Sequence, residues 1–110
     1  PVQENVNIGM TASTVIEKYA LDAVSSSATS TTVTLTNNTA SSVSVQYILA
    51  AYTADGQMVA SSTVASDLQS QKSIKLTVQY SAKDQVSWVS AFVLQAGTLQ
   101  PLRAVWKKAL

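Results

Sequence analysis

The chain has 110 residues, of which 46% are hydrophobic and 12% are charged, and its formal net charge is +1. This length fits one domain with a self-sufficient core, and so small a charge creates no long-range field that would gather nucleic acid. Sixteen Ser and twelve Thr residues keep the sequence polar without charge. Because surfaces rich in hydroxyl groups are common in secreted bacterial proteins, we expect a secreted or cell-surface protein. Because the net charge is small, we expect that it binds no nucleic acid.

Two missing residue types exclude much of enzyme chemistry. The chain has no Cys, which excludes disulfides and thiolate metal sites, and no His, the commonest general base and metal ligand. No apolar run approaches the ~18 residues that a membrane-spanning helix needs. We expect no catalytic residues, no cofactor, no metal site and no membrane insertion. The acidic residues form no recognisable catalytic pair or calcium-binding cluster; they are Glu4, Glu17, Asp22, Asp55, Asp67 and Asp84.

The first 17 residues differ from the rest of the chain. Val6, Ile8 and Met10 alternate with Asn and Gly, which suits a short strand with one apolar face. The run 14–17 fits a capping box that opens a helix, but a strand over 18–24 is the interpretation we prefer, because the sequence downstream is β-rich. The chain begins at Pro1 without a recognisable signal peptide. We therefore expect either that a leader has been removed or that these residues are a piece of a longer chain.

Six further strands are predicted in chain order, over 32–36, 43–52, 58–64, 73–80, 86–94 and 99–106. The strand over 32–36 alternates and ends at an Asn-Asn turn signal. Both faces of the strands over 43–52 and 86–94 are apolar, which is expected of central strands that are covered on each side. Pro101 limits the last strand to an edge or a bend.

Asp55-Gly56 is the strongest local signal, between the strands over 43–52 and 58–64. Asp-Gly suits the positive φ angles of a type I′ turn, so a β-hairpin is predicted here. About seven strands with turns every 8–12 residues indicate an all-β protein, an immunoglobulin-like antiparallel β-sandwich. We expect an additional N-terminal strand-like extension over residues 1–17 and the sandwich over residues 18–110.

Four segments follow one another in an order that resembles a known kind of module. They are Asn37-Asn38-Thr39, the run 50–59, the run 89–93 and the run 98–102. Together they resemble the small immunoglobulin-like or fibronectin-like β-sandwich accessory modules of secreted and cell-surface proteins from Gram-positive anaerobic bacteria. The resemblance spans about residues 31–102 and implies a non-catalytic extracellular module, without supplying a ligand. The Trp-Asp and Tyr-Asp pairs of those modules fall at Leu94-Gln95 and Tyr52-Thr53, so a role of that Trp or Asp is not carried over.

The two ends of the chain carry opposite charge. Residues 1–17 contain two acids and no base, whereas the last eight residues contain three bases. A surplus strand can pair with the open sheet edge of a neighbouring copy, and head-to-tail contacts that do not close produce filaments. We predict a structural or adhesive protein, a pilus-like filament subunit that joins copies of itself or other surface proteins by terminal strand exchange. The predicted interface residues are Glu4, Val6, Ile8, Met10, Glu17, Arg103, Trp106 and Lys107.

Two alternatives to the filament remain at this point. In the first, the N-terminal strand completes a sheet of its own domain. In the second, the chain is a carbohydrate-binding accessory module, because sugar rings stack on exposed aromatic faces. Trp88 and Phe92 share a strand face and are expected to fill the core, whereas Trp106 is the best candidate for an exposed ring. The residues considered for a sugar platform are Tyr52, Tyr80, Trp88 and Trp106.

Overall fold

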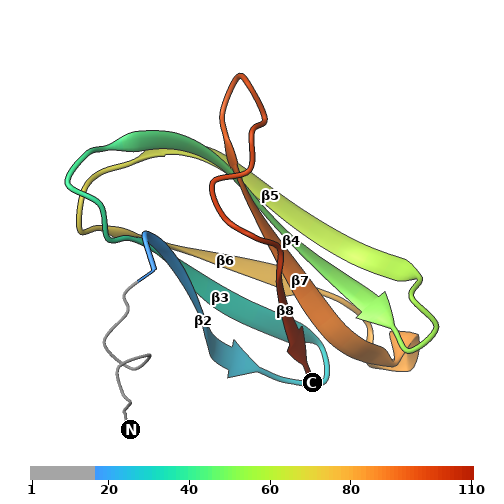
Figure 1. Cartoon of the computed structure of the whole chain (residues 1–110). Coiled ribbons are helices and arrows are strands. Elements are labelled where there is room, and N and C mark those ends of the chain that lie inside the picture. The colour runs from blue at the N-terminus through green and yellow to red at the C-terminus, as the bar shows by residue number, and fades with distance from the viewer. Residues whose placement is uncertain (1–16) are drawn as a thin grey trace, which may run out of the picture.

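The computed structural model describes residues 17–110, which form seven β-strands and one short 3₁₀ helix (Figure 1). In chain order these are β2 (Tyr19–Ser26), β3 (Ser30–Asn37), β4 (Val43–Thr53), β5 (Met58–Leu68), β6 (Ser73–Gln79), the 3₁₀ helix η3 (Ala82–Asp84), β7 (Val86–Gln95) and β8 (Trp106–Ala109).

The strands form two antiparallel sheets that pack face to face. One sheet has the order β2-β3-β6, and the other has the order β5-β4-β7-β8. The prediction of an immunoglobulin-like β-sandwich is therefore confirmed. Figure 1 shows β2 and β8, the edge strands nearest the two chain ends, on the same side of the sandwich.

The core lies between the sheets and is built by strand alternation. Alternate residues of β4 point inward, and four of them are fully buried: Val45, Tyr47, Leu49 and Ala51. The hydroxyl of Tyr47 on β4 donates a hydrogen bond of 2.9 Å to the carbonyl of Val33 on β3, which joins the two sheets. The buried hydrophobic residues around it are Leu21, Leu35, Val45, Leu49, Ala51, Leu68, Val78, Val89, Ala91 and Val93.

The hairpin between β4 and β5 is confirmed, but its predicted type I′ turn is wrong. Gly56 has a φ of 89°, whereas Asp55 is not among the residues with positive φ. The Gly56 N–H donates to the Thr53 carbonyl at 3.0 Å, and the Thr53 N–H donates to the Gln57 carbonyl at 2.9 Å. These bonds define a three-residue loop, a type I turn followed by a left-handed glycine. The Thr53 hydroxyl also donates to the Asp55 carboxylate, which favours this turn.

The two ends of the described region settle two further predictions. The preferred strand over 18–24 is confirmed as β2, and the strand predicted over 6–10 lies outside the described residues. The last strand predicted over 99–106 is wrong, because β8 begins at Trp106. Gly97 (φ 88°) and Leu99 (φ 57°) both have left-handed backbone and turn the chain away from β7. Pro101 makes only an isolated bridge to Leu94 before β8 pairs with β7.

Candidate functional site

The four-stranded sheet has a second apolar surface on the side that faces away from the core. The register places Tyr52 of β4 opposite Trp88 of β7, and Ile48 opposite Phe92. All four side chains are partly exposed. Among residues 17–110 the strands form only the two sheets, so no strand lies over this outer face. The expectation that both faces of the central strands would be covered is therefore wrong for residues 17–110.

Two small residues on this outer face show how closely its larger side chains pack. Ala50 and Ser90 lie opposite each other between the two apolar rows. They are only 1% and 2% exposed, although they point away from the core. We attribute this burial to the larger side chains two residues away along each strand. The outer face therefore has a continuous apolar surface across β4 and β7.

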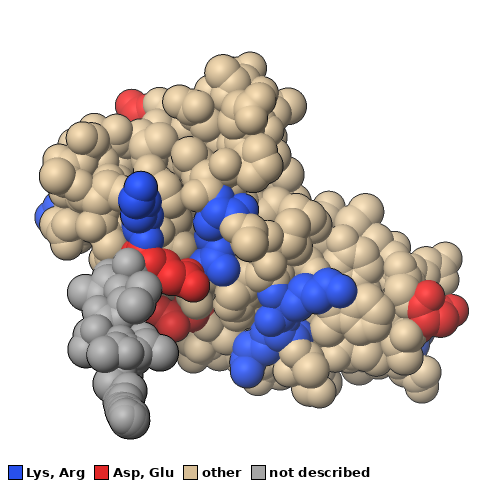
Figure 2. Space-filling view, in the orientation of Figure 1, with Lys and Arg blue, Asp and Glu red and all other residues tan. Residues whose placement is uncertain are grey.

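The aromatic pair on this face has a defined geometry. The rings of Tyr52 and Trp88 stack with centroids 5.5 Å apart and an interplanar angle of 13°. The ammonium of Lys107, on β8, lies 5.6 Å from the centre of the Trp88 ring, within cation–π range. Because β7 lies between β4 and β8, Trp88 stands between Tyr52 on one side and Lys107 on the other. Figure 2 shows basic side chains over β8.

The structure corrects the predicted roles of the aromatic residues. Trp88 and Phe92 were expected in the core, but Val89, Ala91 and Val93 take the inward positions of β7, which leaves the residues between them outside. Trp106 was expected to be the best candidate for an exposed ring; it lies opposite Ala91, is partly buried and packs against the core.

Tyr80 is the fourth aromatic residue predicted for a sugar platform. It also packs against the core. Its hydroxyl shares a hydrogen bond of 2.8 Å with the Thr31 hydroxyl and donates to the Ser27 carbonyl at 3.1 Å. Of the four predicted platform residues, the structure thus brings together only Tyr52 and Trp88.

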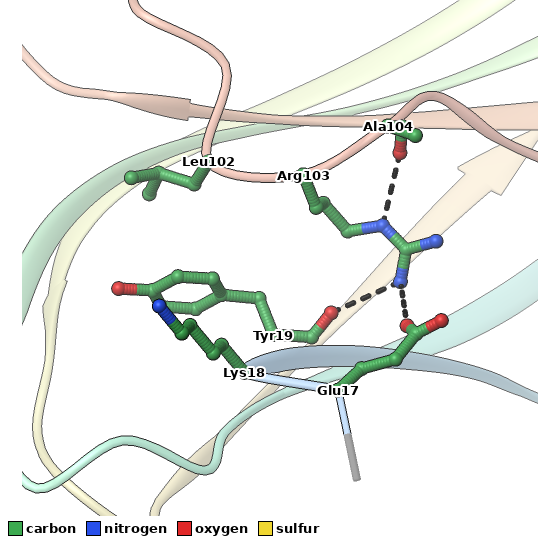
Figure 3. A pocket seen from close by; sticks show the side chains of 6 residues that line it. All are labelled: Glu17, Lys18, Tyr19, Leu102, Arg103 and Ala104. Atoms are coloured by element: carbon green, nitrogen blue, oxygen red, sulfur yellow. Dashed lines mark hydrogen bonds and ion pairs between the residues drawn. The ribbon is translucent and has the colours of Figure 1, made fainter. Parts of the chain in front are cut away.

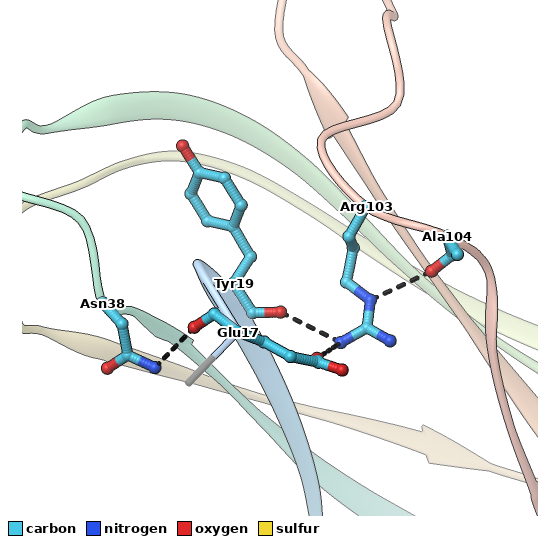
Figure 4. A network of polar contacts seen from close by, with 5 residues as sticks. All are labelled: Glu17, Tyr19, Asn38, Arg103 and Ala104. Carbon is cyan, nitrogen blue, oxygen red and sulfur yellow. Dashed lines mark hydrogen bonds and ion pairs between the residues drawn. The ribbon is translucent and has the colours of Figure 1, made fainter. Parts of the chain in front are cut away.

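Three of the residues predicted for assembly lie near one another on the side of the sandwich that carries β2 and β8. A shallow pocket of about 270 Å³ lies there, and Arg103 reaches across it toward Glu17 (Figure 3). The Arg103 guanidinium forms an ion pair of 2.6 Å with Glu17 and donates to the carbonyls of Tyr19 at 3.0 Å and Ala104 at 2.9 Å (Figure 4). Glu17 and Arg103 therefore meet within one chain, with Trp106 in a neighbouring pocket.

Strand exchange between copies stays a prediction. Four of its residues, Glu4, Val6, Ile8 and Met10, lie outside the described residues. Lys107, which was predicted for the same interface, lies instead beside Trp88 on the outer sheet face.

We expect Arg103 to stabilise the fold mainly through its hydrogen bonds to the two backbone carbonyls, and less through its ion pair with Glu17. The Arg103 side chain is 16% exposed, whereas that of Glu17 is 60% exposed. Arg103→Ala should lower the free energy of unfolding by about 1.5 kcal/mol, because two carbonyls lose a donor. Glu17→Gln should lower it by less than about 0.5 kcal/mol, as for an exposed ion pair. Urea unfolding of both variants measures the difference, and equal losses would contradict this ranking.

The described residues offer little for metal or membrane chemistry. Residues 17–110 contain no group of three or more acidic side chains placed to hold a metal ion. In the same part of the chain, no helix is long and apolar enough to cross a membrane. The outer sheet face carries aromatic rings, hydroxyl groups, the Gln46 amide, Lys107 and, at its β5 edge, the Asp67 carboxylate.

Comparison with known proteins shows similarity at the level of fold. No protein-family model and no curated protein matches the sequence. A Bacteroides uniformis β-glucuronidase 2, covalently bound to cyclophellitol-6-carboxylate aziridine, matches with a TM-score of 0.52 and 10% identity over 84% of this chain. A second structure of a Bacteroides uniformis β-glucuronidase gives the same TM-score and identity. The chain spans only 13% of either neighbour. At this identity, the shared feature is the β-sandwich.

Proposed function

We propose that the chain is a non-catalytic accessory module of a carbohydrate-active protein, and that the outer face of its four-stranded sheet binds glycan. The observation that carries this proposal is the stacked Tyr52–Trp88 pair on a sheet face that no described strand covers. Sugar rings have apolar faces that stack on aromatic rings, and binding sites combine such rings with a few polar groups.

The fold neighbours support the proposal indirectly. They are β-glucuronidases, enzymes of carbohydrate chemistry by name, and the chain corresponds to 13% of their length. A segment of that size fits an accessory module better than a whole enzyme. The chain's Ser and Thr content supports a secreted or cell-surface location, which we include in the proposal.

The polar groups that a glycan needs lie next to the aromatic pair. Ser61 and Thr63 on β5 are exposed and lie opposite Ala50 and Ile48, so both point to the outer face. Their hydroxyl groups can exchange hydrogen bonds with sugar hydroxyls while a sugar ring contacts Tyr52 on the side away from Trp88. That side faces β5, where Met58, which is 56% exposed, lies opposite Tyr52.

A glycan array, followed by isothermal titration with the best ligand, tests the proposal. Tyr52→Ala and Trp88→Ala should each weaken binding about tenfold, equivalent to about 1.4 kcal/mol. Trp106→Phe is the matched control, because Trp106 packs against the core instead of the outer face. The proposal fails if the native chain binds no glycan, or if both alanine variants bind as tightly as the native chain while circular dichroism shows them folded.

A further inference from the structure

Lys107 is the charged residue that lies directly against the aromatic pair. It lies opposite Ser90, so its side chain shares the outer face with Trp88, and its ammonium lies 5.6 Å from the centre of that ring. Within residues 17–110 the one ion pair joins Glu17 and Arg103. No carboxylate of the described residues therefore neutralises Lys107 at contact distance.

The acidic residues at the edges of this face each accept a hydrogen bond from a residue other than Lys107. Asp67 lies on β5, at the opposite edge of the sheet from β8, where its carboxylate accepts a hydrogen bond from Ser44. Asp55 and Asp84 lie beyond the strand ends, and each carboxylate accepts a hydrogen bond within its own loop. The positive charge beside Trp88 is thus available to a ligand.

The position of Lys107 distinguishes acidic from neutral sugars. A neutral sugar that approaches Trp88 from the β8 side displaces the Lys107 ammonium from the ring. The cation–π contact is then lost, and no ion pair replaces it. An anionic sugar draws the ammonium off the ring into an ion pair and at the same time contacts the exposed aromatic face. The ion pair then replaces the cation–π contact, so uncovering the ring costs little.

We propose that the outer sheet face selects acidic glycans, whose rings carry a carboxylate or a sulfate group, through Lys107. This inference rests on the proposed glycan-binding function and adds the ligand class to it. On the β8 side of the aromatic pair, Trp88 contacts the apolar side of the sugar, and Lys107 pairs with its anionic group. Lys108, the next residue of β8, lies opposite Val89 and takes the other face, so it has no part in the site.

The test compares oligogalacturonate, its methyl ester and a sulfated neutral oligosaccharide by isothermal titration. The native chain should bind oligogalacturonate or the sulfated probe at least about tenfold more tightly than the methyl ester. Lys107→Gln should abolish that preference, while Lys108→Gln, with the same loss of charge on the same strand, should change affinity less than about twofold. The two anionic probes decide between carboxylate and sulfate.

Three other outcomes would overturn the proposed selectivity, and they differ in what they mean for the proposed function. Equal affinity for the ester and the acid, with Lys107→Gln unchanged, overturns the selectivity and leaves the proposed function standing. Equal losses in the two lysine variants show attraction by overall charge and also overturn it. If no neutral or acidic glycan binds, the proposed function fails and the inference fails with it.

Discussion

Tyr47→Ala is expected to lower the free energy of unfolding by about 4 kcal/mol, a large share of the stability of a domain this size. Tyr47 is fully buried on β4, and its hydroxyl donates to the Val33 carbonyl of the opposite sheet at 2.9 Å. Alanine leaves both a cavity and a carbonyl without this partner. Tyr52→Ala, the same change on the outer face of the same strand, should cost only about 1 kcal/mol. Urea unfolding measures both, and similar losses would contradict the assigned inner and outer faces.

The same residue predicts a dependence of stability on alkaline pH. Burial raises the pKa of Tyr47 above its ordinary value of 10.0, because the charged phenolate is poorly solvated between the sheets. Above about pH 10 the unfolded chain therefore loses a proton that the folded chain keeps. The stability that Tyr47 contributes is complete below that pH and falls by about 1.4 kcal/mol per pH unit above it. Tyr47→Phe should remove this part of the slope, and an unchanged slope between about pH 9 and 11 would contradict it.

Asn37→Leu should lower the free energy of unfolding by about 3 kcal/mol, the second large effect we expect. Asn37 is fully buried at the end of β3. Its amide group donates to the carbonyls of Ser41 at 2.9 Å and Leu68 at 3.0 Å, and its side-chain carbonyl accepts from the backbone and hydroxyl of Thr39. Leucine is similar in size to asparagine, so the substitution leaves little cavity. The decrease in the free energy of unfolding therefore measures mainly the lost hydrogen bonds.

The neighbouring residue provides a matched control for this prediction. Asn38 is partly exposed, and its amide donates a single hydrogen bond of 2.9 Å to the Glu17 carbonyl. Asn38→Leu should therefore cost less than about 1 kcal/mol. Thermal or urea unfolding of the two variants compares them directly. Equal losses would show that the hydrogen bonds of Asn37 are not what fixes the loop between β3 and β4.

Strand alternation made most of the fold predictable from the sequence. Residues 32–36 and 73–80 have one apolar face each, so their orientation follows from the pattern. The strands over 43–52 and 86–94 are apolar on both faces. The alternation of side chains along these strands therefore does not indicate which face points into the core. A finer signal exists in β4, where Gln46 shares its face with Tyr52, whereas Val45 and Leu49 share an entirely apolar one. A polar residue on one face marks that face as the outer one.

The site itself depends on contacts that sequence spacing does not give. The cation–π contact joins Lys107 to Trp88 through the register of a four-residue strand. That register was unpredictable because the chain between β7 and β8 turns at Gly97 and Leu99, where a strand had been expected. The Glu17–Arg103 pair likewise joins residues 86 positions apart.

The central claim is that glycan binds on the outer face of β4 and β7. Its most direct test is a ¹H–¹⁵N correlation spectrum of the chain, titrated with oligogalacturonate and with its methyl ester. The two tryptophans are natural reporters, because Trp88 lies on the outer face and Trp106 packs against the core. We predict that the indole N–H of Trp88 and the amides around Tyr52 and Lys107 shift on titration, while the indole of Trp106 does not. Shifts confined to Trp106 and the loops, or no shifts with either ligand, would contradict the account.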